Sequence, residues 1–249
     1  MSFFRSKPFV AVIMTLFVIG VPFFLISTNL RTVINSGWLY SIGASNFDTL
    51  ERTGMTRDEY LRVTKEIKRY FKSDEEPLQV KAVVFGSEEE IFTTREVRHM
   101  SDVKLMVRGL AKVQWCSLFF MLGVLVIGRF LWGTKALWPR IAKGLLWGAV
   151  LTIALLVVIG LASVIGFDAA FTWFHEVAFE NNRWLLNTND YLLLMFPENF
   201  FLTATLIAAG MTVAQAVVTG AVARVYLRRT RTRSTGDGPN PSRSDPTSK

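Results

Sequence analysis

The stretch GLLWGAVLTIALLVVIGLASVIGF, residues 144–167, decides the fold because none of its side chains is charged. A helix needs roughly 20 apolar residues to cross the hydrocarbon core of a bilayer, and this stretch meets that length. Three other runs meet it as well, at residues 8–28, 113–132 and 200–223. The sequence therefore predicts an α-helical membrane protein with four transmembrane helices.

The overall composition is that of a membrane protein and not of a soluble domain. Hydrophobic residues make up 51% of the chain, and the mean hydropathy is +0.32. The first run follows the basic residues Arg5 and Lys7, as the apolar part of a signal peptide would. It is long for such a segment and no clean small-residue cleavage site follows it, so we expect an uncleaved helix.

The distribution of basic residues predicts the orientation in the membrane. Lys and Arg are concentrated in the N-terminal tail (1–7), in the link between the second and third runs (133–143) and in the C-terminal tail (224–249). Loops rich in Lys and Arg stay in the cytoplasm, so both termini and the link are predicted to be cytoplasmic. The formal charge of +8 comes from these segments and indicates topology and contact with anionic lipids, not binding of nucleic acid. The last tail ends in a Gly/Pro/Ser-rich sequence and is predicted to be disordered.

A polar segment, residues 29–112, is predicted to form a small extracytoplasmic cap with both helix and strand. Its first eighty residues are electrically neutral, with thirteen basic and thirteen acidic side chains. Thr56 and Glu59 have the spacing of a capping box and predict a helix after them. The run LQVKAVVF, residues 78–85, has the β-branched content of a strand. The acidic residues 88–90 are expected to form only a solvated turn.

The second outer segment, residues 168–199, carries an unusual number of aromatic residues. Trp and Tyr favour the level of the lipid headgroups, where a ring is half in water and half in hydrocarbon. An aromatic belt accounts for most of them. So many in one loop also predict that the loop lies in the interface, at the depth of the lipid ester carbonyls, which is the first indication of a substrate.

The only two histidines lie on this outer side. His99 is found in TTREVRHMSDVK, residues 93–104, where Thr93 or Thr94 is expected to cap a helix. On such a helix Glu96, His99 and Asp102 share one face, so a carboxylate could hold one ring nitrogen and leave the other free. His175 follows Phe171 by four residues in the aromatic segment. The placement favours a pair of histidines acting together.

Other uses of the histidines are open from the residues alone. Each could be a structural or a solvated side chain. A metal site is disfavoured, because a structural zinc ion has four protein ligands and a catalytic one three, while no third imidazole exists. We therefore predict no metal and no cofactor.

Two motifs resemble one bacterial family. REVRHMSDVK (95–104) and FHEVAFENNRWLLNTNDYLLLMFPENFF (174–201) are similar to the signatures of the lipoprotein intramolecular transacylases. The resemblance implies a four-helix enzyme of the bacterial plasma membrane with a β-containing outer cap and its site on the extracytoplasmic side. It maps the family's essential histidine pair onto His99 and His175. Supporting residues are then expected at Asp102, Glu96, Trp184 and Glu198.

The implied reaction moves the sn-2 acyl chain of a diacylglyceryl lipoprotein onto the α-amine of its N-terminal cysteine. The expected partners are therefore the lipoprotein and membrane phospholipids. Histidine suits this chemistry, because it can take a proton from the amine and later return one to the departing alkoxide. Two other functions remain open, which are a membrane sensor or partner-binding protein without enzymatic activity, and a lipid-ester hydrolase that uses the same two histidines.

Overall fold

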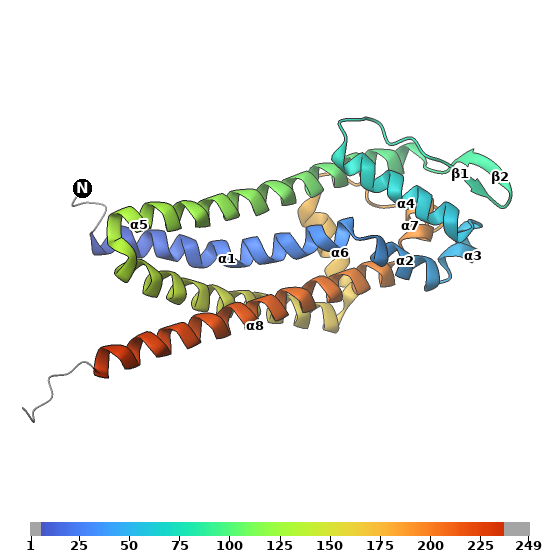
Figure 1. Ribbon diagram of the computed structural model, residues 1–249. Helices are drawn as coiled ribbons and strands as arrows, with labels where there is room; N and C mark the ends of the chain where they lie inside the picture. The colour runs from blue at the N-terminus through green and yellow to red at the C-terminus, as the bar shows by residue number, and fades with distance from the viewer. Residues whose placement is uncertain (1–5, 237–249) are drawn as a thin grey trace, which may run out of the picture.

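The computed structural model describes residues 6–236, apart from the side chains of residues 162–165 and 233–236 (Figure 1). It is mostly helical, with a single two-stranded sheet among the described residues. The helices are α1 (Lys7–Asn35), α2 (Gly37–Ser45), α3 (Thr49–Thr53), α4 (Arg57–Lys72), α5 (Thr94–Ile165), α6 (Phe167–Ala178), α7 (Tyr191–Met195) and α8 (Glu198–Gly236). The strands are β1 (Lys81–Val84) and β2 (Ser87–Glu90).

Three of these helices are long and apolar enough to cross a membrane, at Lys7–Asn35, Thr94–Leu161 and Glu198–Thr232. The sequence predicted four spans, and the number differs because the runs 113–132 and 144–167 both belong to α5. In Figure 1, α1 lies between the outgoing and returning parts of α5, and α8 lies beside the returning part. The beginning of α1, the reversal of α5 and the end of α8 are at the same end of the bundle.

The reversal of α5 is made by a single residue, Gly133. Its φ of 72° and ψ of 163° fall in a region that is essentially open only to glycine, because a Cβ atom would clash with the backbone there. The expected link 133–143 is thus helical from its second residue onward. We call residues 94–132 the first limb of α5 and residues 134–165 the second limb.

Small residues allow the long helices to approach each other closely. The core of the bundle contains Phe17 and Val21 of α1, packed against α5 and α8. Gly148 of the second limb faces Val21 so closely that a Cβ atom at Gly148 would lie 2.5 Å from the Cβ of Val21. Such close contact through small residues is typical of helix packing in membranes.

Replacing Gly148 by valine is expected to destabilise the bundle. Adding bulk to a packed interface typically costs about 1–3 kcal/mol. At Gly148, the new atoms would overlap α1. The thermal midpoint of the purified protein in detergent should fall. Gly160→Val is the matched control, because Gly160 is exposed and a Cβ there meets nothing within 4 Å. Equal thermal midpoints for the two variants would contradict the close contact between Gly148 and Val21.

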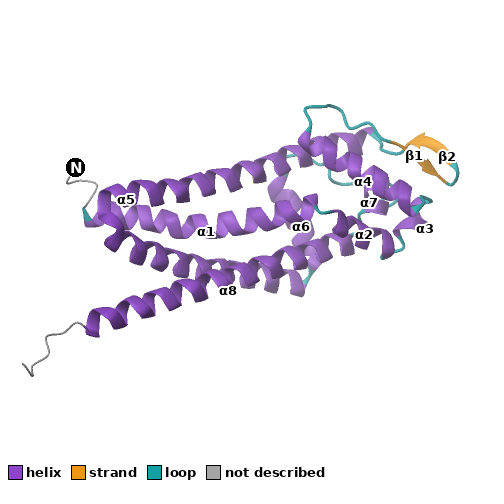
Figure 2. Ribbon diagram, in the orientation of Figure 1, coloured by secondary structure: helices purple, strands orange, loops and turns teal. Residues whose placement is uncertain are grey.

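The cap lies at the opposite end of the bundle from Gly133 and is built mainly from helices (Figure 2). Thr56 accepts a hydrogen bond from the N–H of Glu59 at 3.2 Å, so α4 begins where the sequence predicted. The expected strand 78–85 is shorter, at Lys81–Val84. It pairs with β2 in an antiparallel hairpin whose two turn residues both have positive φ.

The expectation for the acidic residues 88–90 was wrong, because they belong to β2. All four residues of that strand are exposed, so charge does not prevent them from pairing with β1. The C-terminal tail also differs from its prediction, since α8 continues as a helix through residues 224–236. The rest of the predicted disordered tail, 237–249, lies outside the described residues.

Candidate active site

The start of α5 is fixed by a complete capping box. The hydroxyl of Thr93 accepts a hydrogen bond from the N–H of Glu96 at 3.3 Å, and the Glu96 carboxylate accepts one from the N–H of Thr93 at 2.7 Å. Of the two threonines considered from the sequence, Thr93 is therefore the cap. His99 follows within two turns of this rigid start, and only 8% of its surface is exposed.

His175 is held in one tautomer by the backbone of its own helix. Its Nδ1 atom lies 2.7 Å from the carbonyl oxygen of Phe171, one turn earlier in α6. A carbonyl oxygen can only accept a hydrogen bond, so Nδ1 must carry the proton. The lone pair of the neutral ring is then on Nε2, which is the state that a general base requires.

The fold brings the two histidines together from different helices. Their ring centroids are 6.2 Å apart, with an angle of 35° between the ring planes. Phe179 lies against both, at 5.2 Å from His99 and 5.6 Å from His175. Trp184 lies 5.1 Å from the His175 ring. The pair is therefore enclosed by aromatic side chains, and a substrate group between the rings would be largely shielded from water.

This enclosure keeps both histidines neutral. His99 and His175 lie outside the apolar runs 113–132 and 144–167. Burial lowers the pKa of His99 to about 4, helped by the positive charge that His175 can carry and opposed by Asp102. Burial also lowers the pKa of His175, while its hydrogen bond to Phe171 opposes that shift. At neutral pH, each ring therefore offers one N–H donor and one lone pair.

The lowered pKa of His99 predicts a loss of stability in mild acid. Below pH 6.5 the unfolded chain binds a proton at this residue and the folded chain does not, so stability falls as the pH drops from 6.5 toward 4. The contribution is at most about 1.4 kcal/mol per pH unit. His99→Phe keeps the ring and should make the thermal midpoint less sensitive to a change from pH 7.5 to pH 5. Identical pH sensitivity of the two proteins would contradict this.

Asp102 contacts the other motif and does not hold His99. Its carboxylate accepts a hydrogen bond from the side-chain amide of Asn181 at 3.1 Å and forms an ion pair with Arg183 at 3.2 Å. The Nδ1 atom of His99 is buried and has no hydrogen-bond partner among the described residues. Asp102 therefore acts on His99 through its charge, and its direct contacts connect α5 to the loop that carries Trp184.

Glu96 does not contact the histidine rings either, and instead joins α5 to α7. It is fully buried, and its second carboxylate oxygen accepts a hydrogen bond from the N–H of Leu192 at 2.8 Å. Burial raises the pKa of Glu96, and the backbone hydrogen bonds oppose that shift. One carboxylate thus satisfies the beginnings of two helices, and it fixes the segment after Trp184 against the helix that carries His99.

Glu198 lies away from the two rings, at the first residue of α8. A side-chain hydrogen bond with Asp168 in α6, together with burial, raises the pKa of Glu198. Nearby, Phe171 and Phe201 are in ring contact at 5.3 Å. Glu198 therefore connects α8 to the helix that carries His175. Of the four expected supporting residues, only Trp184 touches a histidine.

Sequence reasoning missed two residues that the structure places at the site. Asn181 and Arg183 bind Asp102 from a loop about eighty positions later in the chain. The signal was present, because Arg183 is the only basic residue in the acidic segment 168–199. Within residues 6–236, no group of three or more His, Cys, Asp or Glu side chains is placed to hold a metal ion.

Comparisons with known proteins agree on one family. A sequence model described as "Lipoprotein intramolecular transacylase Lit" matches residues 15–201. The solved structure of the membrane integral lipoprotein intramolecular transacylase Lit from Bacillus cereus has a TM-score of 0.75 at 21% identity, covering 91% of this chain and 100% of that one. A variant of that protein with a histidine replaced by arginine gives 0.73 at 21% identity, with coverages of 94% and 98%. An uncharacterised Aquifex aeolicus protein is 28% identical over 172 residues, 69% of this chain and 73% of its own length.

The solved structures share the fold, and the family match covers both histidine segments and every supporting residue named above. The chain therefore belongs to the lipoprotein intramolecular transacylase family, Lit.

Proposed function

We propose that this protein moves the sn-2 acyl chain of a diacylglyceryl lipoprotein to the α-amine of its N-terminal cysteine, using His99 and His175. The observation that carries the proposal is the meeting of two neutral imidazoles, 6.2 Å apart, in an aromatic enclosure. Because the substrate contains both the nucleophile and the ester, the enzyme needs to supply only proton transfer, polarisation and proximity.

The geometry supports different roles for the two rings. His175 donates from Nδ1 to Phe171, so its Nε2 is the base that takes the proton of the attacking amine nitrogen. His99 stays neutral and is suited to donate a hydrogen bond to the ester carbonyl oxygen as negative charge develops there. A neutral imidazole is able to polarise a carbonyl in this way.

The bonds and protons of the reaction balance without a further reactant. The amine nitrogen attacks the sn-2 carbonyl carbon, and the N–H proton passes to His175. The tetrahedral intermediate then breaks its bond to the glyceryl oxygen. His175 returns the proton to that oxygen, which leaves an amide on the cysteine and a free hydroxyl on the glycerol. Aromatic contacts of Trp184 and Phe179 keep water, the competing nucleophile, away from the carbonyl.

We further propose that each limb of α5 crosses the membrane once, giving four crossings with both termini in the cytoplasm and the histidines on the outer side of a bacterial plasma membrane. Ser87 lies on the exposed strand β2 and Thr134 is exposed beside Gly133. In a Cys116→Ser background, cysteine at position 87 should react with an impermeant maleimide in intact cells. Cysteine at position 134 should react only after lysis. The reverse pattern would overturn the orientation.

Mass spectrometry of lipoprotein N-terminal peptides, from cells with and without this protein, tests the reaction. Intramolecular transfer conserves mass, so the product is an isomer of the substrate whose fragments carry the acyl group on nitrogen. A hydrolase would give a peptide lighter by one acyl group. Peptides with the same mass and the same fragments in both kinds of cell would overturn both enzymatic functions and favour a sensor or partner-binding protein.

A further inference from the structure

A cavity of about 460 Å³ lies at the end of the bundle where α5 reverses. It is far from the histidines and is formed by both limbs of α5 and the first turn of α1. Its lining residues are Val10, Arg129, Phe130, Leu131, Trp132, Gly133, Ala136 and Arg140. The volume is within the range of small-molecule sites.

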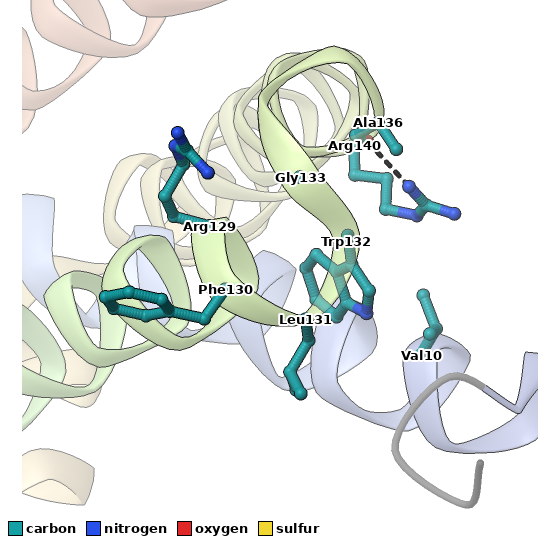
Figure 3. A pocket seen from close by; sticks show the side chains of 8 residues that line it. All are labelled: Val10, Arg129, Phe130, Leu131, Trp132, Gly133, Ala136 and Arg140. Carbon is teal, nitrogen blue, oxygen red and sulfur yellow. Dashed lines mark hydrogen bonds between the residues drawn. The ribbon is translucent and has the colours of Figure 1, made fainter. Parts of the chain in front are cut away.

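Arg140 and Trp132 lie on the same side of this cavity, beside α1. Figure 3 shows the Arg140 guanidinium and the indole N–H edge of Trp132 on the side of Val10, whereas Arg129 projects to the other side of the turn. The indole Nε1 of Trp132 is buried and has no hydrogen-bond partner among the described residues. Arg140 lies over the Trp132 ring at 5.4 Å and donates from Nη1 to the carbonyl oxygen of Ala136 at 2.6 Å. A guanidinium has five N–H groups, so donors remain for a ligand.

Among the described residues at this end of the bundle, no acidic side chain is available to pair with these groups. Residues 1–47, 103–167 and 199–236 include no aspartate or glutamate. These ranges supply every helix at this end of the bundle (Figure 1). The second limb of α5 also begins here, and the N-terminal end of a helix attracts anions. An anion that neutralises Arg140 must therefore come from outside the described chain.

We propose that this cavity binds the phosphate of an anionic phospholipid, with the guanidinium of Arg140, held over the Trp132 ring, as its donor. Arginine suits phosphate because its planar fork can give two parallel charge-assisted hydrogen bonds. The exposed aromatic ring of Phe130 and the apolar surface of both limbs flank the cavity and fit the acyl chains of a lipid. A zwitterionic lipid carries a cation next to its phosphate, which the surrounding Arg and Lys side chains would repel. In the orientation proposed above, the site takes a lipid of the cytoplasmic leaflet.

Native mass spectrometry of the purified full chain in detergent tests the site. Phosphatidylglycerol, phosphatidylcholine with the same acyl chains and inorganic phosphate are titrated separately. We expect one tightly held phosphatidylglycerol per chain and much weaker phosphatidylcholine. Arg140→Gln should weaken phosphatidylglycerol about tenfold or more, because a charged hydrogen-bond donor is lost. Trp132→Leu removes the ring over which Arg140 lies and should weaken binding by a smaller factor.

Lys143→Gln is the matched control, because it removes one exposed positive charge at the same end of the bundle without lining the cavity. Its affinity should remain within about twofold of the wild type, as expected for a screened surface charge. Three results would overturn the proposal. The first is equal binding of the two lipids, and the second is an equal loss of phosphatidylglycerol affinity in Arg140→Gln and Lys143→Gln. The third is displacement of phosphatidylglycerol by millimolar inorganic phosphate, which would indicate a site for free phosphate. Arg140→Lys keeps the charge, loses the planar fork and should still weaken phosphatidylglycerol, so it decides the matter if Arg140→Gln does not purify as a single species.

Discussion

Replacing either His99 or His175 is expected to reduce formation of the N-acylated lipoprotein by about 10²–10⁴-fold, the usual contribution of general acid–base groups. Both rings are 8% exposed and lie among aromatic side chains, so alanine would also leave a cavity that destabilises the site. Phenylalanine is the sharper substitution, because it keeps a ring of similar size and removes the nitrogens. The readout is the fraction of isomeric peptide that carries its acyl group on nitrogen.

The double variant gives further information about how the two rings act. If His99 and His175 work on the same tetrahedral intermediate, the double variant should be scarcely slower than either single variant, as for other coupled catalytic groups. Independent roles would instead give multiplying losses. Wild-type product from a well-folded His175→Phe protein would show that the histidines are structural, and would contradict the proposed reaction.

Replacing Glu96 by alanine is expected to be among the most destabilising changes in the cap. It leaves the N–H groups of Thr93 and Leu192 without their partners. The Leu192 hydrogen bond is buried, so its loss costs about 1–3 kcal/mol, whereas Thr93 is exposed and its N–H can bind water. A loss of about 1–3 kcal/mol should appear as a lower thermal midpoint in detergent. Activity should fall with it, because α7 and the Trp184 loop would no longer be held against α5.

Two further variants separate this role from an effect of charge. Glu96→Gln keeps an oxygen that can accept one of the two hydrogen bonds, so its loss should be about half as large. Glu90→Ala removes a carboxylate that is exposed on β2 and should change nothing measurable. An unchanged midpoint for Glu96→Ala would show that α7 is held by its apolar contacts alone.

Much of the fold follows from local chemistry and could be predicted from the sequence. The apolar runs determine which residues form long helices, and Thr56 and Thr93 mark two helix starts with a hydroxyl that accepts a backbone N–H. The reversal within α5 could not be predicted, because glycine is compatible both with a helix and with the φ of 72° seen at Gly133. Tertiary packing makes that choice.

At the candidate site, the sequence predicted that the two histidines lie together but not how the residues around them are connected. The motifs named both histidines, and the fold places them 6.2 Å apart. The helical spacing suggested that Asp102 would bind His99 one turn away, but Asp102 binds Arg183, a residue 81 positions later. Helical periodicity identifies only neighbours on the same helix. It does not predict contacts that depend on chain folding, or the burial that lowers the histidine pKa values.

In the proposed topology, where each limb of α5 crosses the membrane once, the folded shape of α5 should also make the site responsive to the thickness of the bilayer. His99 is carried by the first limb, whereas His175 is attached to the end of the second limb through Gly166 and α6. A helix that is too long for its membrane tilts, and a change of tilt that is not shared equally by the two limbs alters the spacing between their outer ends. In that topology we expect the separation of the two rings to depend on hydrophobic mismatch, and lipid chain length to influence how often the pair reaches its working geometry.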